Sequence, residues 1–145
     1  MQKSIIITGA GRGIGAATAK TFLEAGYRVG LIGRNEDTLK AAAGDHPDSM
    51  VLVCDVGDPA SVDQAFGTAM HAWGRLDVLF NNAGRGSPPK TADETDIDTW
   101  MDVVRVNLTG SFLCARAASA TLPSQSPRGA RLTHNASRTA HATRP

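Results

Sequence analysis

The chain has 145 residues, of which 41% are hydrophobic and 20% are charged, and its formal net charge at pH 7 is +1. This is the composition of one ordinary globular domain with a sizeable core, and the near-zero charge excludes a strong overall bias toward nucleic acid or an anionic membrane. No stretch approaches the roughly 20 apolar residues of a membrane span, and the N-terminal apolar run is too short for a secretory signal. Cys54 and Cys114 are therefore expected to be reduced packing residues in a cytoplasmic protein.

The first predicted unit is a strand, a glycine-rich turn and a helix. Residues 4–7 are typical of a buried strand, and the Ala-rich residues 13–25 are typical of a helix. Between them glycines recur at Gly9, Gly13 and Gly15. Gly9 can adopt backbone angles that are closed to other residues, and Gly13 and Gly15 are expected to let the backbone approach a ligand. The first turn of such a helix presents unpaired N–H groups at the positive end of its dipole, which favours a diphosphate.

The segment from Thr8 to Gly15 departs from the general dinucleotide fingerprint G-x-G-x-x-G, because Ile14 stands where that pattern has glycine. Its pattern, Thr-Gly-x-x-x-Gly-Ile-Gly, resembles the cofactor loop of the short-chain dehydrogenase/reductase family, and the resemblance covers about residues 3–122. The resemblance implies hydride transfer between NAD(H) or NADP(H) and a small-molecule carbonyl or alcohol. It also implies an α/β fold, a Rossmann-like doubly wound parallel sheet in the order 3-2-1-4-5 that is incomplete at its C-terminal side. The expected cofactor contacts in this loop are Gly9, Arg12, Gly13, Ile14 and Gly15.

A second strand is predicted over residues 27–32, followed by a glycine and Arg34. In dinucleotide folds an acid roughly 20 residues past the glycines binds the ribose 2′-hydroxyl, whereas arginine accommodates a 2′-phosphate. The strand ends without an acid, so Arg34, assisted by Arg12, favours NADP(H), with NAD(H) as the alternative. In that alternative Arg34 is a solvated loop residue and Glu36 or Asp37 binds the ribose, although a helix N-terminus would also attract both acids.

A short helix over residues 36–43 is expected to lead to a third strand over 50–54, which ends at Asp55 and Val56. In the family an Asp-Val pair at this point contacts the adenine ring, and the carboxylate accepts a hydrogen bond from the exocyclic amine. The pair Asp58-Pro59 then predicts the N-cap and first residue of another helix. The apolar residues of that helix recur every three or four positions and are expected to pack on the sheet: Val62, Ala65, Phe66, Ala69 and Trp73.

A fourth strand over residues 76–80 runs into Asn-Asn-Ala-Gly at positions 81–84, which is a second strong match to the family. Asparagine side chains can link neighbouring strand ends through paired donors and acceptors. By family position Asn82, Ala83 and Gly84 contact the cofactor, and the small residues let the strand end lie flat against the ribose. The alternative interpretation is a bare turn.

The next helix is expected to be capped by Thr95 and to carry Ile97, Trp100, Met101 and Val104 on one face. Asn107 follows in a helix that is otherwise apolar, where a polar side chain costs stability unless it is hydrogen-bonded. In the family an asparagine in this Val-Asn-Leu setting kinks the helix, and its carbonyl holds a water that feeds a proton relay. Asn107 is therefore a candidate catalytic residue, with a helix-surface asparagine as the alternative. The helix over 108–121 is the expected surface for a homo-oligomer.

Residues 130–135 are predicted to form a fifth strand, although Arg131 and His134 stand where a buried parallel strand would be apolar. Ser137 falls in register with the family's active-site serine, which hydrogen-bonds the substrate oxygen. The predicted organisation is thus a Rossmann domain over 1–122 and a basic, poorly patterned segment over 123–145. That segment has four arginines and no acid, but arginines scattered without aromatic residues make a poor nucleic-acid surface. The sequence suggests no metal site.

The family's proton donor is a tyrosine in a Tyr-x-x-x-Lys motif that follows the active-site serine. This sequence has one tyrosine, Tyr27, at the start of the second predicted strand, and no lysine four residues later. The expectation is an NAD(P)-dependent oxidoreductase by resemblance, with this chain a catalytically incomplete N-terminal fragment. The alternative is a non-catalytic dinucleotide-binding or protein-interaction module that uses the sheet edge and the helix over 108–121.

Overall fold

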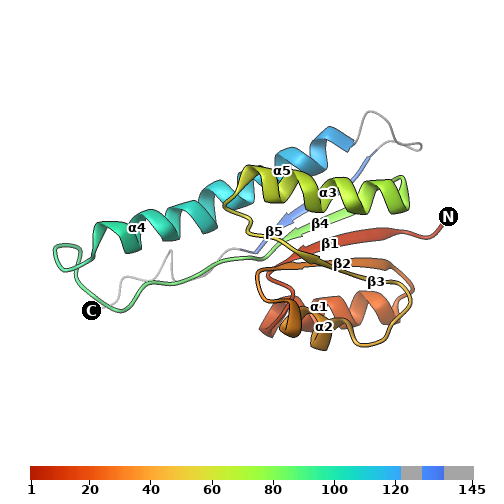
Figure 1. Ribbon diagram of the computed structural model, residues 1–145, viewed down its shortest axis with the longest axis horizontal. Helices are drawn as coiled ribbons and strands as arrows, with labels where there is room; N and C mark the ends of the chain where they lie inside the picture. The colour runs from red at the N-terminus through yellow and green to blue at the C-terminus, as the bar shows by residue number, and fades with distance from the viewer. Residues whose placement is uncertain (122–128, 136–145) are drawn as a thin grey trace.

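Five parallel strands form one sheet in the order β3-β2-β1-β4-β5 in the computed structural model, which describes residues 1–121 and 129–135 (Figure 1). The predicted strand order is therefore confirmed. The strands are β1 (Ser4–Thr8), β2 (Arg28–Gly33), β3 (Ser49–Val53), β4 (Val78–Asn81) and β5 (Arg131–His134). The helices are α1 (Gly13–Glu24), α2 (Glu36–Ala43), α3 (Pro59–Trp73), α4 (Ile97–Val104) and α5 (Gly110–Thr121), with a π-helical turn, η1 (Arg105–Thr109), between α4 and α5.

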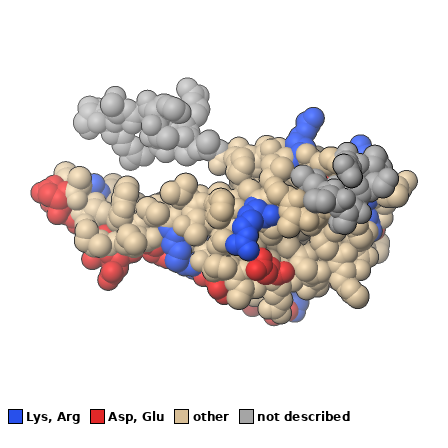
Figure 2. Space-filling model, turned by 90° about the horizontal axis from the view of Figure 1, so that it is seen from above, with Lys and Arg blue, Asp and Glu red and all other residues tan. Residues whose placement is uncertain are grey.

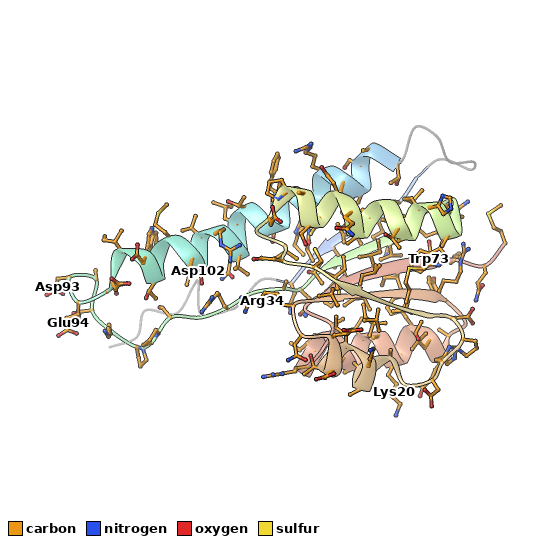
Figure 3. All side chains as sticks on the ribbon, viewed as in Figure 1. Lys20, Arg34, Trp73, Asp93, Glu94 and Asp102 are labelled. Carbon is orange, nitrogen blue, oxygen red and sulfur yellow. The ribbon has the colours of Figure 1, made fainter. Side chains whose placement is uncertain are left out.

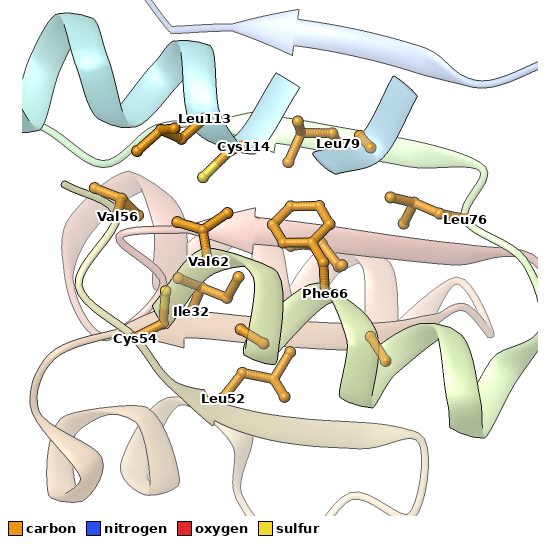
Figure 4. Close-up of a cluster of buried hydrophobic side chains, with 14 of the residues drawn as sticks. Ile32, Leu52, Cys54, Val56, Val62, Phe66, Leu76, Leu79, Leu113 and Cys114 are labelled. Carbon is orange, nitrogen blue, oxygen red and sulfur yellow. The ribbon is translucent and has the colours of Figure 1, made fainter. Parts of the chain in front are cut away.

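Helices lie on both faces of the sheet, and β1 divides its side chains between them. Ile5 and Ile7 belong to a core with α1 and α2, whereas Ile6 belongs to a core with α3 and α5. All three side chains are 1% exposed or less. Because successive side chains of a strand point to opposite sides of the sheet, β1 is buried on both sides. Figure 4 shows the second core, in which Phe66 of α3 lies near Leu79 of β4. Burying each such side chain contributes about 1.5–3 kcal/mol before conformational entropy is subtracted.

The ends of the helices follow the local sequence, with one correction. Asp58 caps α3, because its carboxylate accepts a hydrogen bond from the backbone N–H of Ala60 at 3.3 Å, and Pro59 begins the helix. The expectation that Thr95 caps α4 is wrong. The cap is Asp96, whose carboxylate accepts from the N–H of Thr99 at 2.9 Å, while the Thr95 hydroxyl donates to the carbonyl of Thr91. A carboxylate interacts more favourably with the positive end of the helix than a hydroxyl does.

The described helices leave part of the sheet open on the α1 side. A cavity of about 880 Å³ lies between α1 and strands β4 and β5, and its apolar walls include Phe22, Val78 and Phe80. β5 itself is mostly exposed, with only Leu132 partly buried among its four residues. A parallel sheet normally has both faces covered along its whole width, so this edge is the least complete part of the described fold.

The helix α4 projects beyond the end of the sheet toward which all five strands run (Figure 1). None of its residues is buried, and Ile97, Trp100 and Met101 are 72%, 58% and 58% exposed. Figure 2 looks down on α3, α4 and α5, where uncharged residues form much of the visible surface and acidic side chains gather at the far end of α4. No helix within the described residues is long and apolar enough to cross a membrane.

Candidate dinucleotide site

The glycine loop lies at the carboxyl end of β1 and runs directly into α1. Gly9 and Gly13 have φ angles of +65° and +52°, a region in which side chains are strained. Arg12 is the N-cap residue of α1 but makes no side-chain capping bond, and Ile14 is 62% exposed. The N–H donors of the first turn of α1 therefore fit a diphosphate group, and Ile14 provides an accessible apolar surface beside them.

The structural reason for glycine differs between positions 13 and 15 of the loop. A Cβ on Gly13 would meet nothing within 4 Å, so the positive φ is what requires glycine there. Gly15 is different, because a Cβ would lie 2.1 Å from the carbonyl oxygen of Gly9 and 2.8 Å from Nδ2 of Asn82. Glycine at position 15 therefore lets α1 pack against the loop, and its expected role in the approach of a ligand stays a prediction.

Thr8 joins the end of β1 to the end of β4. Its buried hydroxyl oxygen accepts hydrogen bonds from the backbone N–H groups of Asn82 and Ala83, at 3.0 and 2.9 Å. The Asn82 side chain returns the contact by donating to the carbonyls of Thr8 and Gly9, at 3.1 and 3.3 Å. The expected linking of strand ends by asparagine is therefore present. Thr8 is not among the predicted site residues, although a hydroxyl residue that ends a buried apolar strand is a usable signal for such a role.

A cavity of about 170 Å³ lies where the carboxyl ends of β1 to β4 meet. Six of the residues expected to contact a cofactor line it: Gly9, Arg34, Asp55, Val56, Ala83 and Gly84. The remaining expected residues, Arg12, Gly13, Ile14, Gly15 and Asn82, lie on the glycine loop or beside it. Figure 3 shows Arg34 at this end of the sheet.

Arg34 is available for an external anion. It is exposed, and within residues 1–121 and 129–135 neither it nor Arg12 has an ion-pair partner. The acids of the alternative interpretation stand in the first turn of α2, where Glu36 pairs with Lys40 at 2.7 Å. The helix dipole and the pair across one helical turn therefore already explain why acids stand at the start of α2.

Asp55 is held in the cavity by two donors. Its Oδ1 accepts from the backbone N–H of Gly57 at 2.9 Å, and its Oδ2 accepts from Nη1 of Arg105 at 2.9 Å. Partial burial alone would raise the pKa of this carboxyl group, but the Gly57 and Arg105 hydrogen bonds outweigh it and hold the pKa below its ordinary value. Arg105 is not among the residues predicted from the sequence, because an arginine in an α-helical stretch carries no sign of a partner 50 residues away.

Asn107 lies in the π-helical turn, so the helix is irregular at the expected position. Its side chain binds the loop after β4: Oδ1 accepts from the N–H of Arg85 at 2.8 Å and Nδ2 donates to the Arg85 carbonyl at 2.9 Å. Its backbone carbonyl accepts from the Ser111 hydroxyl at 2.8 Å. The arrangement brings Asn107 beside the cofactor-side loop, whereas Ser137, the other candidate catalytic residue, lies outside the described residues.

The described residues include no group of three His, Cys, Asp or Glu side chains that could hold a metal ion. The site instead combines a glycine loop, a helix N-terminus and a cavity at the carboxyl ends of parallel strands, which defines a Rossmann-type dinucleotide-binding domain. The family model for short chain dehydrogenases matches residues 3–140. The chain belongs to this family of NAD(P)-dependent oxidoreductases, which bind a nicotinamide cofactor.

Similar proteins agree with the family. An uncharacterised short-chain type dehydrogenase/reductase of Sinorhizobium fredii is 44% identical over 115 residues, which cover 74% of this chain and 45% of that protein. L-fucose dehydrogenase of Bos taurus is 33% identical over 80% of this chain and 43% of its own length. The crystal structure of a 3-ketoacyl-(acyl-carrier-protein) reductase from Brucella melitensis complexed with NADH superposes with a TM-score of 0.80 at 31% identity, covering 83% of this chain and 50% of that one. The chain thus spans about half the length of its relatives.

Proposed function

We propose that this chain is the cofactor-binding part of an NADP(H)-dependent oxidoreductase that acts on a small carbonyl or alcohol substrate. The observation that carries the proposal is the glycine loop, which is fixed to the end of β4 by Thr8 and Asn82 and opens onto the cavity lined by Arg34 and Asp55. The nicotinamide group would supply or accept the hydride. The residues of this chain would bind the cofactor and orient it.

Each part of the cofactor has a chemically suitable partner in this proposal. The N–H groups at the start of α1 would bind the diphosphate, with Ile14 against the cofactor. Arg34, with Arg12 nearby in the loop, would pair with a 2′-phosphate, because an arginine binds phosphate through charge-assisted hydrogen bonds. Asp55 and Val56 would contact the adenine. The segment 82–84 would lie against the ribose on the nicotinamide side.

Asn107 and Ser137 are the proposed contributors to the reaction itself. Asn107 is held against the loop after β4 by two hydrogen bonds to the Arg85 backbone, which supports a role in orienting a proton path beside the cofactor. The proposed role of Ser137, hydrogen bonding to the substrate oxygen, rests on its place in the sequence. We also propose a cytoplasmic location, because both cysteines, Cys54 and Cys114, are free thiols, as is usual in reducing compartments.

The substitution Arg34→Asp is expected to reverse the cofactor preference. Wild-type protein should bind NADPH more tightly than NADH, and the variant should lose about tenfold or more in NADPH affinity, because a charge-assisted contact becomes a repulsion. Titrations followed by nicotinamide fluorescence give both dissociation constants. The matched control is Arg116→Asp, at an exposed arginine of α5. Equal affinities in the wild type, or an unchanged order in Arg34→Asp, would contradict the assignment of NADP(H).

We further propose that the chain forms a homo-oligomer through the helix over 108–121 and the neighbouring α4. Leu108 and Phe112 are 68% and 62% exposed, and Trp100 extends the same type of apolar surface onto α4. Phe112→Glu is expected to shift the protein to a smaller species, measured by light scattering after size exclusion, whereas Gln64→Glu at an exposed position of α3, outside the proposed interface, should not. If the wild type is already monomeric at all concentrations, this oligomer does not form.

A second candidate function is a non-catalytic module that binds a dinucleotide and a protein partner. The observation that favours it is the same exposed apolar surface of α4, whose residues Ile97, Trp100 and Met101 do not line the cofactor cavity. Carbonyl-dependent oxidation of the bound cofactor would contradict this non-catalytic module, whereas binding without oxidation is expected of these 145 residues under both functions.

A further inference from the structure

We propose that Arg105 is a positioning residue for base recognition. It fixes the Asp55 carboxylate so that the cavity selects adenine, which presents an exocyclic amine, over a base that presents an oxygen in place of that amine. This inference rests on the proposed binding of a dinucleotide. It adds a residue that contacts no part of the cofactor and that determines which base the site accepts.

The geometry leaves Asp55 both fixed and available. A carboxylate has about four lone-pair positions, and two are used here, one by the N–H of Gly57 and one by Nη1 of Arg105. Each oxygen thus keeps one acceptor position. The donors come from different parts of the fold, the turn after β3 and the π-helical turn, so the carboxylate cannot rotate without losing one of them. An exocyclic amine, which donates, suits such a group, whereas a carbonyl oxygen would face negative charge.

Arg105 is itself held in position by a second acid. Its Nε and Nη2 donate to Oδ1 of Asp102 at 3.2 and 3.0 Å, and Asp102 also pairs with the guanidinium of Arg85. The side chains of Asp55 and Arg105 are 34% and 37% exposed, so solvent screens the pair only partly. Figure 3 shows Asp102 on α4, beyond the end of the sheet at which Arg34 lies.

Burial raises the pKa of Asp55, but the Gly57 N–H and the neighbouring arginines together outweigh it and favour the ionised carboxylate. Arg105 from the π-helical turn and Arg34 from the end of β2 both lower its pKa, and Arg85 lines the same cavity. The adjacent Cys54 thiol has a pKa raised by burial and stays neutral. Asp102 lies on the far side of the Arg105 guanidinium and is paired there. Removing Arg105 would therefore leave an acceptor that is free to rotate and more readily protonated.

Gly57 offers a way to move Arg105 without replacing it. A Cβ at position 57 would lie 2.2 Å from Nη1 and 2.9 Å from Cζ of Arg105, and no positive φ requires glycine there. The guanidinium is the far end of a flexible side chain, so Gly57→Ala should displace it while the N–H of residue 57 still binds Asp55. Gly57→Ala is thus expected to reproduce the effect of Arg105→Ala.

The test compares NADPH with its hypoxanthine analogue, in which the exocyclic amine is replaced by a carbonyl oxygen. Dissociation constants are measured for wild type, Arg105→Ala, Arg105→Lys and Gly57→Ala, with Arg116→Ala as the matched control. Wild type and control should prefer NADPH by about tenfold or more, as expected for a hydrogen bond to a charged group. Arg105→Ala and Gly57→Ala should lose most of this preference, and Arg105→Lys should restore part of it.

The outcomes separate this inference from the proposed function. Binding of neither nucleotide by the wild type would overturn both. Binding with the same preference in all variants would overturn the role of Arg105 alone. Tighter binding of both nucleotides by Arg105→Ala would also overturn it, because Arg105 would then compete with the base for Asp55. A loss of affinity that is equal for the two nucleotides would assign Arg105 a purely structural role and contradict base selection.

Discussion

A polypeptide of these 145 residues is expected to bind NADPH but not to oxidise it in the presence of ketones, quinones or aldehydes. A positioned general acid typically contributes about 10²–10⁴ in rate and must lie within hydrogen-bond reach of the substrate oxygen. The single tyrosine, Tyr27, precedes β2 at the opposite end of the sheet from the cavity, where its ring packs edge-to-face on Phe22 with the centroids 4.9 Å apart. It cannot reach a substrate beside the nicotinamide.

The measurement is the absorbance of the reduced nicotinamide with each substrate class, alongside a binding titration on the same preparation. Retained binding without oxidation supports the proposal that the catalytic apparatus is incomplete within these residues. Oxidation that depends on the carbonyl substrate would contradict it. If that oxidation disappeared in Asn107→Ala, the proton path would run through the π-helical turn, and if it persisted, another residue would supply the proton.

The substitution Gly15→Ala is expected to cause the largest loss of stability of any alanine substitution in the glycine loop. The added Cβ would lie 2.1 Å from the carbonyl oxygen of Gly9, and a backbone atom cannot move aside as a side chain can. We expect a destabilisation of about 3 kcal/mol or more together with loss of NADPH binding, since α1 would have to separate from the loop that carries the diphosphate site.

Gly67→Ala is the matched control for this substitution. Gly67 lies in the exposed middle of α3, has no positive φ, and a Cβ there would meet nothing within 4 Å. Alanine should therefore stabilise the helix by about 0.5–1 kcal/mol. Denaturant unfolding of the three proteins gives the comparison. Similar stabilities for Gly15→Ala and the wild type would show that the loop and helix are less tightly packed than the structure indicates.

The sheet was predictable because its signals are local. Apolar runs such as residues 4–7, glycines at the turns and the N-cap pair at Asp58-Pro59 each indicate one element, and right-handed crossovers then order the strands. The ends were less accurate. The fourth strand was expected over 76–80 but runs over Val78–Asn81. Leu76 is buried although it precedes the strand, so its apolar side chain looks in the sequence like a strand residue.

The side-chain network at the site was not predictable from local pattern. Nothing near Arg105 in the sequence indicates that it meets Asp55, because the contact depends on how the π-helical turn approaches the end of β3. The choice of Asp96 over Thr95 as a cap depends likewise on a one-residue difference in where the helix begins. The packing role of Gly15 depends on where the backbone carbonyl of Gly9 lies in space, and neither composition nor periodicity indicates that position.

The hydroxyl of Thr8 also sets when the site can form during folding. Its two donors, the N–H groups of Asn82 and Ala83, are 74 and 75 residues away along the chain. Closing a loop of that length is entropically costly and slow compared with forming α1 or α2. The strand and helix that carry the diphosphate site therefore emerge first during synthesis, but the glycine loop is fixed only after β4 has paired with β1. Binding of a dinucleotide would consequently require the β1–β4 pairing, and the bound dinucleotide would stabilise that pairing together with the first strand–helix unit.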